Sequence, residues 1–251
     1  MLTSIVHGSP SDRAPLLIAH GLYGSGRNWG AIAKRLSDTR QVTAVDMRNH
    51  GESPRFGTHG YPELAEDLAE VLSVESDVIG HSMGGKAAMV LALAHPEKVR
   101  RLIVADIAPV TYTHTQQPMI DAMRTVNLDD IETRRDADDQ LATLVSDASV
   151  RAFLLQSLDV KGKCWRLNLD VLEAEMPKIM SFPEVSGAFS GPTLFLSGGD
   201  SDYVTREHRD TIRHLFPKAR FARIPNAGHW LHADQPRAFE AAARAFLDAD
   251  I

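Results

Sequence analysis

Residues 80–84, Gly-His-Ser-Met-Gly, place a serine where it could act as a nucleophile. They follow a short apolar strand expected over 77–80 and open an alanine-rich helix expected over 83–94. A strand that turns at once into a helix holds its corner residue, Ser82, in an unfavourable backbone conformation, and glycines leave room for close approach. The free N–H groups at the helix start favour negative charge beside this corner. The motif also occurs by chance. A catalytic interpretation therefore requires that the rest of the chain supply a base, an acid and a second oxyanion donor.

The candidate base is His229, in a loop that follows an expected strand and precedes the last expected helix. A loop in that position can carry an imidazole over the carboxyl edge of a parallel sheet, where sites on such sheets collect. A neutral imidazole can take the serine proton near pH 7 and later return it to a leaving group. A surface histidine that caps the helix is the alternative, and the pairing with Ser82 favours catalysis.

Three aspartates could orient the imidazole, because each follows a strand between the nucleophile and the base in chain order. Asp106 directly ends the strand expected over 101–105 and precedes Ile-Ala-Pro, so we expect it to be fixed and partly buried. Asp200 and Asp202 lie in a later loop and flank Ser201, which stands at the usual position of the acid. We favour Asp106 and keep the other two as alternative acids.

The segment His20-Gly21-Leu22-Tyr23-Gly24 follows the strand expected over 15–19 and supplies the second oxyanion donor. The backbone N–H groups of Leu22 and Met83 are expected to converge on the carbonyl oxygen of a substrate. Losing one such donor costs roughly 3–4 kcal/mol of transition-state stabilisation. Tyr23, His81 and Trp230 are expected to line the substrate pocket. No cluster of cysteine and histidine has the spacing of metal ligands, so we expect no metal.

Strands and helices alternate along most of the chain, which predicts βαβ units and an α/β fold with a mostly parallel sheet flanked by helices. From 111 to 188 the pattern is only helical, over 118–127, 138–146, 150–158 and 167–180. We therefore expect a core of 1–110 and 189–251 and a helical cap of 111–188, inserted after the strand that ends at Asp106. The expected strands are 2–6, 15–19, 41–45, 77–80, 101–105, 192–197 and 221–224, and the expected core helices are 28–36, 61–74, 83–94, 206–215 and 236–247.

The composition excludes several classes of function. The 251 residues are 43% hydrophobic and 24% charged, which is ordinary for a globular protein. A net charge of −6 argues against binding to nucleic acid or anionic membranes. No apolar run approaches a membrane span, and residues 1–8 lack the basic and apolar regions of a signal peptide. The single Cys164 fits a reducing compartment, so we expect a cytoplasmic protein. The sequence does not indicate an oligomeric state.

Several motifs, taken together, resemble the α/β-hydrolase superfamily, and within it the small esterases related to abhydrolase domain-containing protein 11. The resemblance runs over nearly the whole chain and implies Ser82 as nucleophile, His229 as base and Asp106 as acid. It also implies hydrolysis of a carboxylester or thioester without a cofactor. Relatives tend to have an amide where this chain has Asp200. The motifs are HGLYGS at 20–25, DMRNHGES at 46–53, GHSMGGKAAM at 80–89, VADIAPV at 104–110, WRLNLDVL at 165–172, GPTLFLSGGDSDYV at 191–204 and NAGHWLHA at 226–233.

The residues thus predict a serine hydrolase that cleaves small to medium acyl esters or thioesters through an acyl-enzyme. Lyases and carbon–carbon bond hydrolases can use the same three residues on the same fold, so both stay as alternatives. A non-catalytic ligand-binding homologue is a further alternative. Such proteins often lose the serine, the histidine or the elbow glycines, and this chain keeps Ser82, His229, Gly80 and Gly84.

Overall fold

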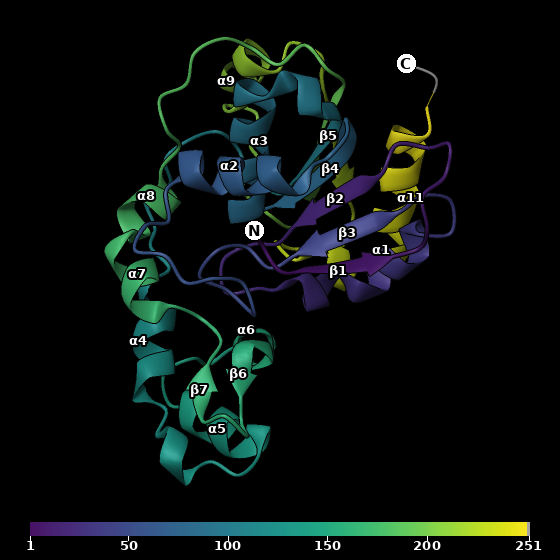
Figure 1. Ribbon diagram of the computed structural model, residues 1–251. Helices are drawn as coiled ribbons and strands as arrows, with labels where there is room; N and C mark the ends of the chain where they lie inside the picture. The colour runs from purple at the N-terminus through teal and green to yellow at the C-terminus, as the bar shows by residue number, and fades with distance from the viewer. Residues whose placement is uncertain (250–251) are drawn as a thin grey trace.

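A seven-stranded sheet forms the centre of the computed structural model, which describes residues 1–249 (Figure 1). The strand order is β1-β3-β2-β4-β5-β8-β9. β1 pairs antiparallel with β3, and every other pair in the sheet is parallel. The predicted α/β class with a mostly parallel sheet is therefore confirmed. The strands are β1 (Ser4–His7), β2 (Leu16–Ala19), β3 (Val42–Val45), β4 (Ser76–His81), β5 (Val99–Ala105), β8 (Thr193–Gly198) and β9 (Ala219–Ile224).

Helices cover both faces of the sheet (Figure 1). α1 (Gly30–Leu36) and α11 (Pro236–Leu247) pack on one face, and α2 (Tyr61–Val71), α3 (Met83–Ala94) and α9 (Arg209–Leu215) pack on the other. Because both faces are covered, the central strands are rich in apolar residues, and every residue of β2, β4 and β8 is buried. α2 ends at Val71 rather than at the expected residue 74. The remaining short helices of this part are η1 (Gly26–Trp29), η2 (Pro96–Lys98) and α10 (Leu231–Asp234).

The segment between β5 and β8 lies to one side of the sheet and is mostly helical (Figure 1). It differs from the expectation in three places. The helix expected over 138–146 covers Arg134–Leu141 instead, because Thr133 caps its start. A two-stranded ribbon pairs residues 158–159 with residues 164–165, and strands of two residues are too short to give a periodic signal. The single helix expected over 167–180 is two helices, because Pro177 lacks the N–H that would continue the first. The elements are α4 (Gln117–Thr125), η3 (Leu128–Asp130), α5 (Arg134–Leu141), α6 (Ala148–Leu154), η4 (Leu155–Ser157), β6 (Leu158–Asp159), β7 (Cys164–Trp165), α7 (Leu169–Ala174) and α8 (Met176–Met180).

The turn from β4 into α3 depends on close contact between backbones. Ser82 at its corner has φ 52° and ψ −121°, outside the helical and extended regions that residues with a side chain prefer. A Cβ atom on Gly80 would overlap the backbone of Gly84, and one on Gly84 would overlap the carbonyl oxygens of Ala19 and His20. The two glycines therefore let α3 start directly against β2 and β4.

We expect Gly84→Ala to lower the free energy of unfolding by about 1–3 kcal/mol, because the new methyl group meets rigid backbone. Gly30→Ala is the matched control, since a Cβ atom there meets nothing within 4 Å and the backbone is helical. This control should stabilise the protein by roughly 0.5–1 kcal/mol. Urea unfolding of both variants measures the difference, and equal stabilities would contradict the close contact.

Candidate active site

Ser82, His229 and Asp106 form a continuous chain of hydrogen bonds. Nε2 of His229 lies 3.0 Å from Oγ of Ser82, and Nδ1 lies 2.8 Å from Oδ2 of Asp106. Ser82 follows β4, Asp106 follows β5, and His229 lies in the loop after β9. The carboxyl ends of these parallel strands meet at one edge of the sheet, which brings together residues that are far apart in sequence. With Nδ1 protonated toward the carboxylate, Nε2 is free to accept the hydroxyl proton of the serine.

Asp106 is completely buried, and three donors surround its carboxylate. Besides His229, the backbone N–H of Gly198 donates to Oδ1 at 3.0 Å, and the hydroxyl of Ser201 donates to Oδ2 at 2.5 Å. A buried carboxylate is stable as an anion only when such donors replace its hydration. The backbone at Asp106 has φ 52°, an uncommon conformation for a residue other than glycine, and these bonds help to hold it there.

The other two candidate acids lie apart from the imidazole. Asp200 and Asp202 are exposed, and within residues 1–249 neither side chain makes a hydrogen bond or an ion pair. The loop contributes Ser201 to the site instead, through the bond to Asp106. The sequence identified Ser201 only by its position in the loop, and its contact with the carboxylate depends on the fold.

Two contacts fix the position of His229. Its ring stacks on that of Tyr203, with centroids 4.1 Å apart and 23° between the planes. Its backbone carbonyl accepts a hydrogen bond of 2.8 Å from Nε2 of His81. His81 therefore holds the loop of the candidate base, in addition to lining the cavity beside Ser82.

The backbone N–H groups of Leu22 and Met83 have no acceptor among the described residues. Met83 begins α3, so its N–H lies beyond the reach of the helical hydrogen bonds. Leu22 follows Gly21, and a Cβ atom on that glycine would lie 3.1 Å from Cβ of Ser82. The loop after β2 thus passes directly beside the serine, where both groups could bind a negatively charged oxygen.

A cavity of about 450 Å³ opens at Ser82 and is lined mainly by apolar side chains. The three expected pocket residues, Tyr23, His81 and Trp230, all line it. Part of its wall comes from the segment between β5 and β8. The lining residues from that segment include Met119, Val145, Val150, Phe153, Leu154, Ile179 and Met180.

A family model described as the alpha/beta hydrolase fold matches residues 14–236. The chain belongs to the α/β-hydrolase family. It is 44% identical over 246 residues to the mouse protein named "sn-1-specific diacylglycerol lipase ABHD11", with 92% of this chain and 80% of that relative covered. It is 38% identical over 242 residues to "Esterase YbfF" of Escherichia coli, with 94% of each chain covered. A solved structure titled "Marine microorganism esterase" matches with a TM-score of 0.92 and 39% identity over 98% of both chains.

These matches confirm the predicted resemblance and support an ester-hydrolysing enzyme. Among residues 1–249 of the hydrolase, no group of three or more histidine, cysteine or acidic side chains could hold a metal ion. Within the same residues, no helix is both long and apolar enough to cross a membrane.

Three buried histidines lie on the serine side of the hydrolase. His20 and His232 line the cavity, and His50 packs against His20. Burial lowers the pKa of His20 to about 4 and the pKa values of His50 and His232 to about 3. His20 and His50 accept backbone N–H bonds from Met47 and Tyr23, and these bonds require neutral rings. His232 stacks on Trp29, with centroids 4.0 Å apart, and its Nδ1 is buried without a partner among the described residues.

Sequence reasoning missed Lys86, which also lines the cavity. It is the one charged residue in the apolar sequence of α3, and that contrast was the available signal. The side chain is 1% exposed, and burial lowers its pKa to about 7.

The low pKa of His232 predicts a loss of stability in acid. The unfolded chain binds a proton at this residue below about pH 6.5 and the folded chain does not, so the free energy of unfolding falls with pH between about 6.5 and 3. His232→Phe keeps an aromatic ring against Trp29. Between pH 7.5 and 5.0 we expect its free energy of unfolding to fall by about 2 kcal/mol less than that of the parent protein. Urea unfolding at the two pH values measures this. The exposed His214→Phe is the control and should behave as the parent protein does; an equal loss in both variants would contradict the prediction.

Proposed function

We propose that the protein is a serine hydrolase that cleaves small to medium acyl esters or thioesters through an acyl-enzyme. The observation that carries this proposal is the hydrogen-bonded chain from Ser82 through His229 to the buried Asp106, with separations of 3.0 and 2.8 Å. These distances suit proton transfer from a nucleophile to a base and orientation of that base by an acid.

In the first half of the reaction, Oγ of Ser82 attacks the carbonyl carbon and its proton passes to Nε2 of His229. Asp106 holds Nδ1–H and stabilises the imidazolium that forms. The N–H groups of Leu22 and Met83 bind the negatively charged oxygen of the tetrahedral intermediate. His229 then gives the proton to the leaving oxygen or sulfur, which leaves an acyl group on the serine.

In the second half, water enters beside His229, which removes a proton as the water attacks the acyl-enzyme. Collapse of the second intermediate releases the acid and returns the proton to Ser82. All of these steps use the chain's own groups, so the mechanism requires no cofactor.

The proposal assigns different roles to two parts of the chain, a core and a cap. Residues 1–110 and 189–251 would form the hydrolase core, since all seven strands of the sheet come from them. Residues 111–188 would form a cap, because they supply one wall of the cavity at Ser82. The single cysteine, Cys164, is exposed and free, which agrees with a reducing compartment such as the cytoplasm.

We expect a fluorophosphonate probe to label the parent protein and not Ser82→Ala, because the probe reacts with the activated hydroxyl. Turnover of p-nitrophenyl butyrate should fall at least about 10⁴-fold in this variant. Ser146→Ala removes another serine that lines the cavity and should keep both labelling and turnover. Labelling that persists in Ser82→Ala would overturn the proposed nucleophile. A panel with acyl thioesters, diacylglycerols and diketones then defines the substrate class.

The role of Asp106 is tested separately. Asp106→Asn cannot accept the Nδ1–H of His229 as a carboxylate does, and we expect kcat to fall about 10⁴-fold. Asp200→Asn and Asp202→Asn alter exposed side chains and should keep kcat within about twofold, because surface changes away from a site have small effects. If Asp106→Asn stayed active and one of the two controls lost most of its kcat, the aspartate changed in that control would be the acid instead.

A further inference from the structure

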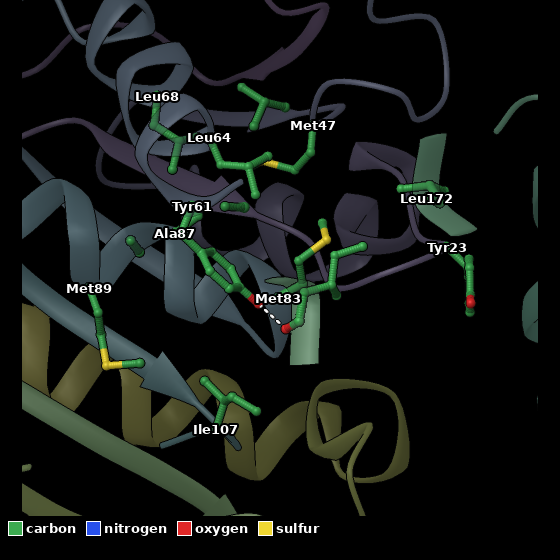
Figure 2. Close-up of a cluster of buried hydrophobic side chains, with 14 of the residues drawn as sticks. Tyr23, Met47, Tyr61, Leu64, Leu68, Met83, Ala87, Met89, Ile107 and Leu172 are labelled. Carbon is green, nitrogen blue, oxygen red and sulfur yellow. Dashed lines mark hydrogen bonds between the residues drawn. The ribbon is translucent and has the colours of Figure 1, made fainter. Parts of the chain in front are cut away.

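Two side chains of the sheet-flanking helices donate hydrogen bonds to the end of α8. The hydroxyl of Tyr61, in α2, donates to the carbonyl oxygen of Ile179 at 2.6 Å. Nζ of Lys86, in α3, donates to the carbonyl oxygens of Met180, at 3.0 Å, and Ser181. Carbonyl groups at the end of a helix have no partner within the helix, so these three depend on donors from elsewhere, and the carbonyl oxygen of Met180 also accepts the backbone N–H of Tyr112 at 3.0 Å. Figure 2 shows Tyr61 in a cluster of buried side chains with Met83 and Ala87, close to the start of α3.

The ammonium group of Lys86 has no carboxylate beside it. Within residues 1–249 it makes no ion pair, whereas the buried Arg40 lies 2.8 Å from Asp77. Its charge instead faces the two carbonyl oxygens and the rings of Tyr61 and Tyr112, whose centroids lie 5.6 and 4.9 Å from Nζ. Removing an ammonium group from water is costly, and the oxygens and rings around Lys86 offset part of that cost.

Lys86 lies at a part of the cavity that is separated from His229 by two tyrosine rings. The ring of Tyr203 stacks on His229, the ring of Tyr112 lies 5.2 Å from that of Tyr203, and Lys86 lies over Tyr112. His229 must protonate the leaving group, so the leaving group lies beside its imidazole. An acyl chain that points away from His229 can then extend toward Lys86 and the residues that it holds.

Ile179 and Met180 line the cavity, as do Tyr61 and Lys86 themselves. We propose that Tyr61 and Lys86 hold residues 179–181 as the end wall of the acyl-binding part of the cavity, and that Lys86 thereby limits the length of the acyl chain. This inference rests on the proposed ester hydrolysis. Lys86 acts in two ways, and both limit the acyl chain. It holds the wall in place, and its polar amino group, charged or neutral, disfavours an apolar chain that reaches it.

The test is the dependence of kcat/KM on acyl length, measured with p-nitrophenyl esters from acetate to dodecanoate. Lys86→Met keeps the apolar stem of the side chain and removes the ammonium group. The ratio of kcat/KM for the dodecanoate to that for the acetate should rise at least about tenfold, which is the discrimination that one misplaced methylene gives in a tight pocket.

Lys98→Met is the matched control. Nζ of Lys98 donates to the carbonyl oxygens of Ala69 and Leu72 at the end of α2, at 2.9 and 3.1 Å, so this variant loses the same kind of contact. Lys98 does not line the cavity, and the control should keep the length profile of the parent protein. A general loosening of the fold would change the length profile of both variants. Loss of the proposed end wall would change only the profile of Lys86→Met.

Tyr61→Phe gives a second measurement that does not depend on the folding of Lys86→Met. It removes one hydroxyl from the wall, leaves the charge in place, and should shift the profile in the same direction by a smaller factor. An unchanged profile in both wall variants, or an equal change in Lys98→Met, would overturn the end wall while ester hydrolysis stands. A parent protein that is neither labelled by fluorophosphonate nor active on any ester would instead overturn the proposed function.

Discussion

The close packing of backbone at the turn from β4 into α3 is the constraint on which the site depends. Gly84 lies against the carbonyl oxygens of Ala19 and His20, so the start of α3 can come this close to the end of β2 only because residue 84 has no side chain. One contact therefore sets three positions: the corner at Ser82, the N–H of Met83 at the helix start, and the loop after β2 that carries Leu22. A side chain at the glycine would separate all three groups at once.

The buried charges of the site are balanced in different ways. Asp106 accepts hydrogen bonds from two segments, the end of β8 with the loop that follows it and the loop after β9, and these donors replace the hydration of its carboxylate. One of these donors is Ser201, a hydroxyl in a loop whose two carboxylates face solvent. A hydroxyl at this place adds a donor to the buried carboxylate, whereas a second carboxylate would add repulsion. Within residues 1–249 the partners of Lys86 are carbonyl oxygens and aromatic rings, so its position depends on the segment between β5 and β8.

Short sequence patterns predict this fold well for the strands whose residues are all or nearly all buried. The apolar runs of β2, β4, β5 and β8 and the elbow at Ser82 follow from side-chain type and spacing, and the structure has them within one or two residues. The meeting of Ser82, His229 and Asp106 could also be expected, because each follows a strand of one parallel sheet. The ribbon at 158–165 could not be expected, because two-residue strands carry no periodicity. The role of Lys86 could not be predicted for another reason. Its partners are backbone carbonyl groups at the end of α8, and the types of side chain in the sequence do not indicate such contacts.

Tyr23 links the chemistry to the wall of the cavity. Its backbone N–H donates to His50 at 3.1 Å, its hydroxyl donates to the carbonyl oxygen of Gln116 at 2.9 Å, and its own carbonyl accepts from Ser157 at 2.7 Å. The last two partners lie in the segment between β5 and β8, Gln116 at the start of α4 and Ser157 in η4, while the neighbouring Leu22 carries a candidate oxyanion donor. A shift of α4 or η4 would therefore displace the loop after β2, which carries the N–H of Leu22. Tyr23 thus connects the helices that line the cavity to the loop of the candidate oxyanion donor, whereas Ser82 and Asp106 directly follow strands of the sheet.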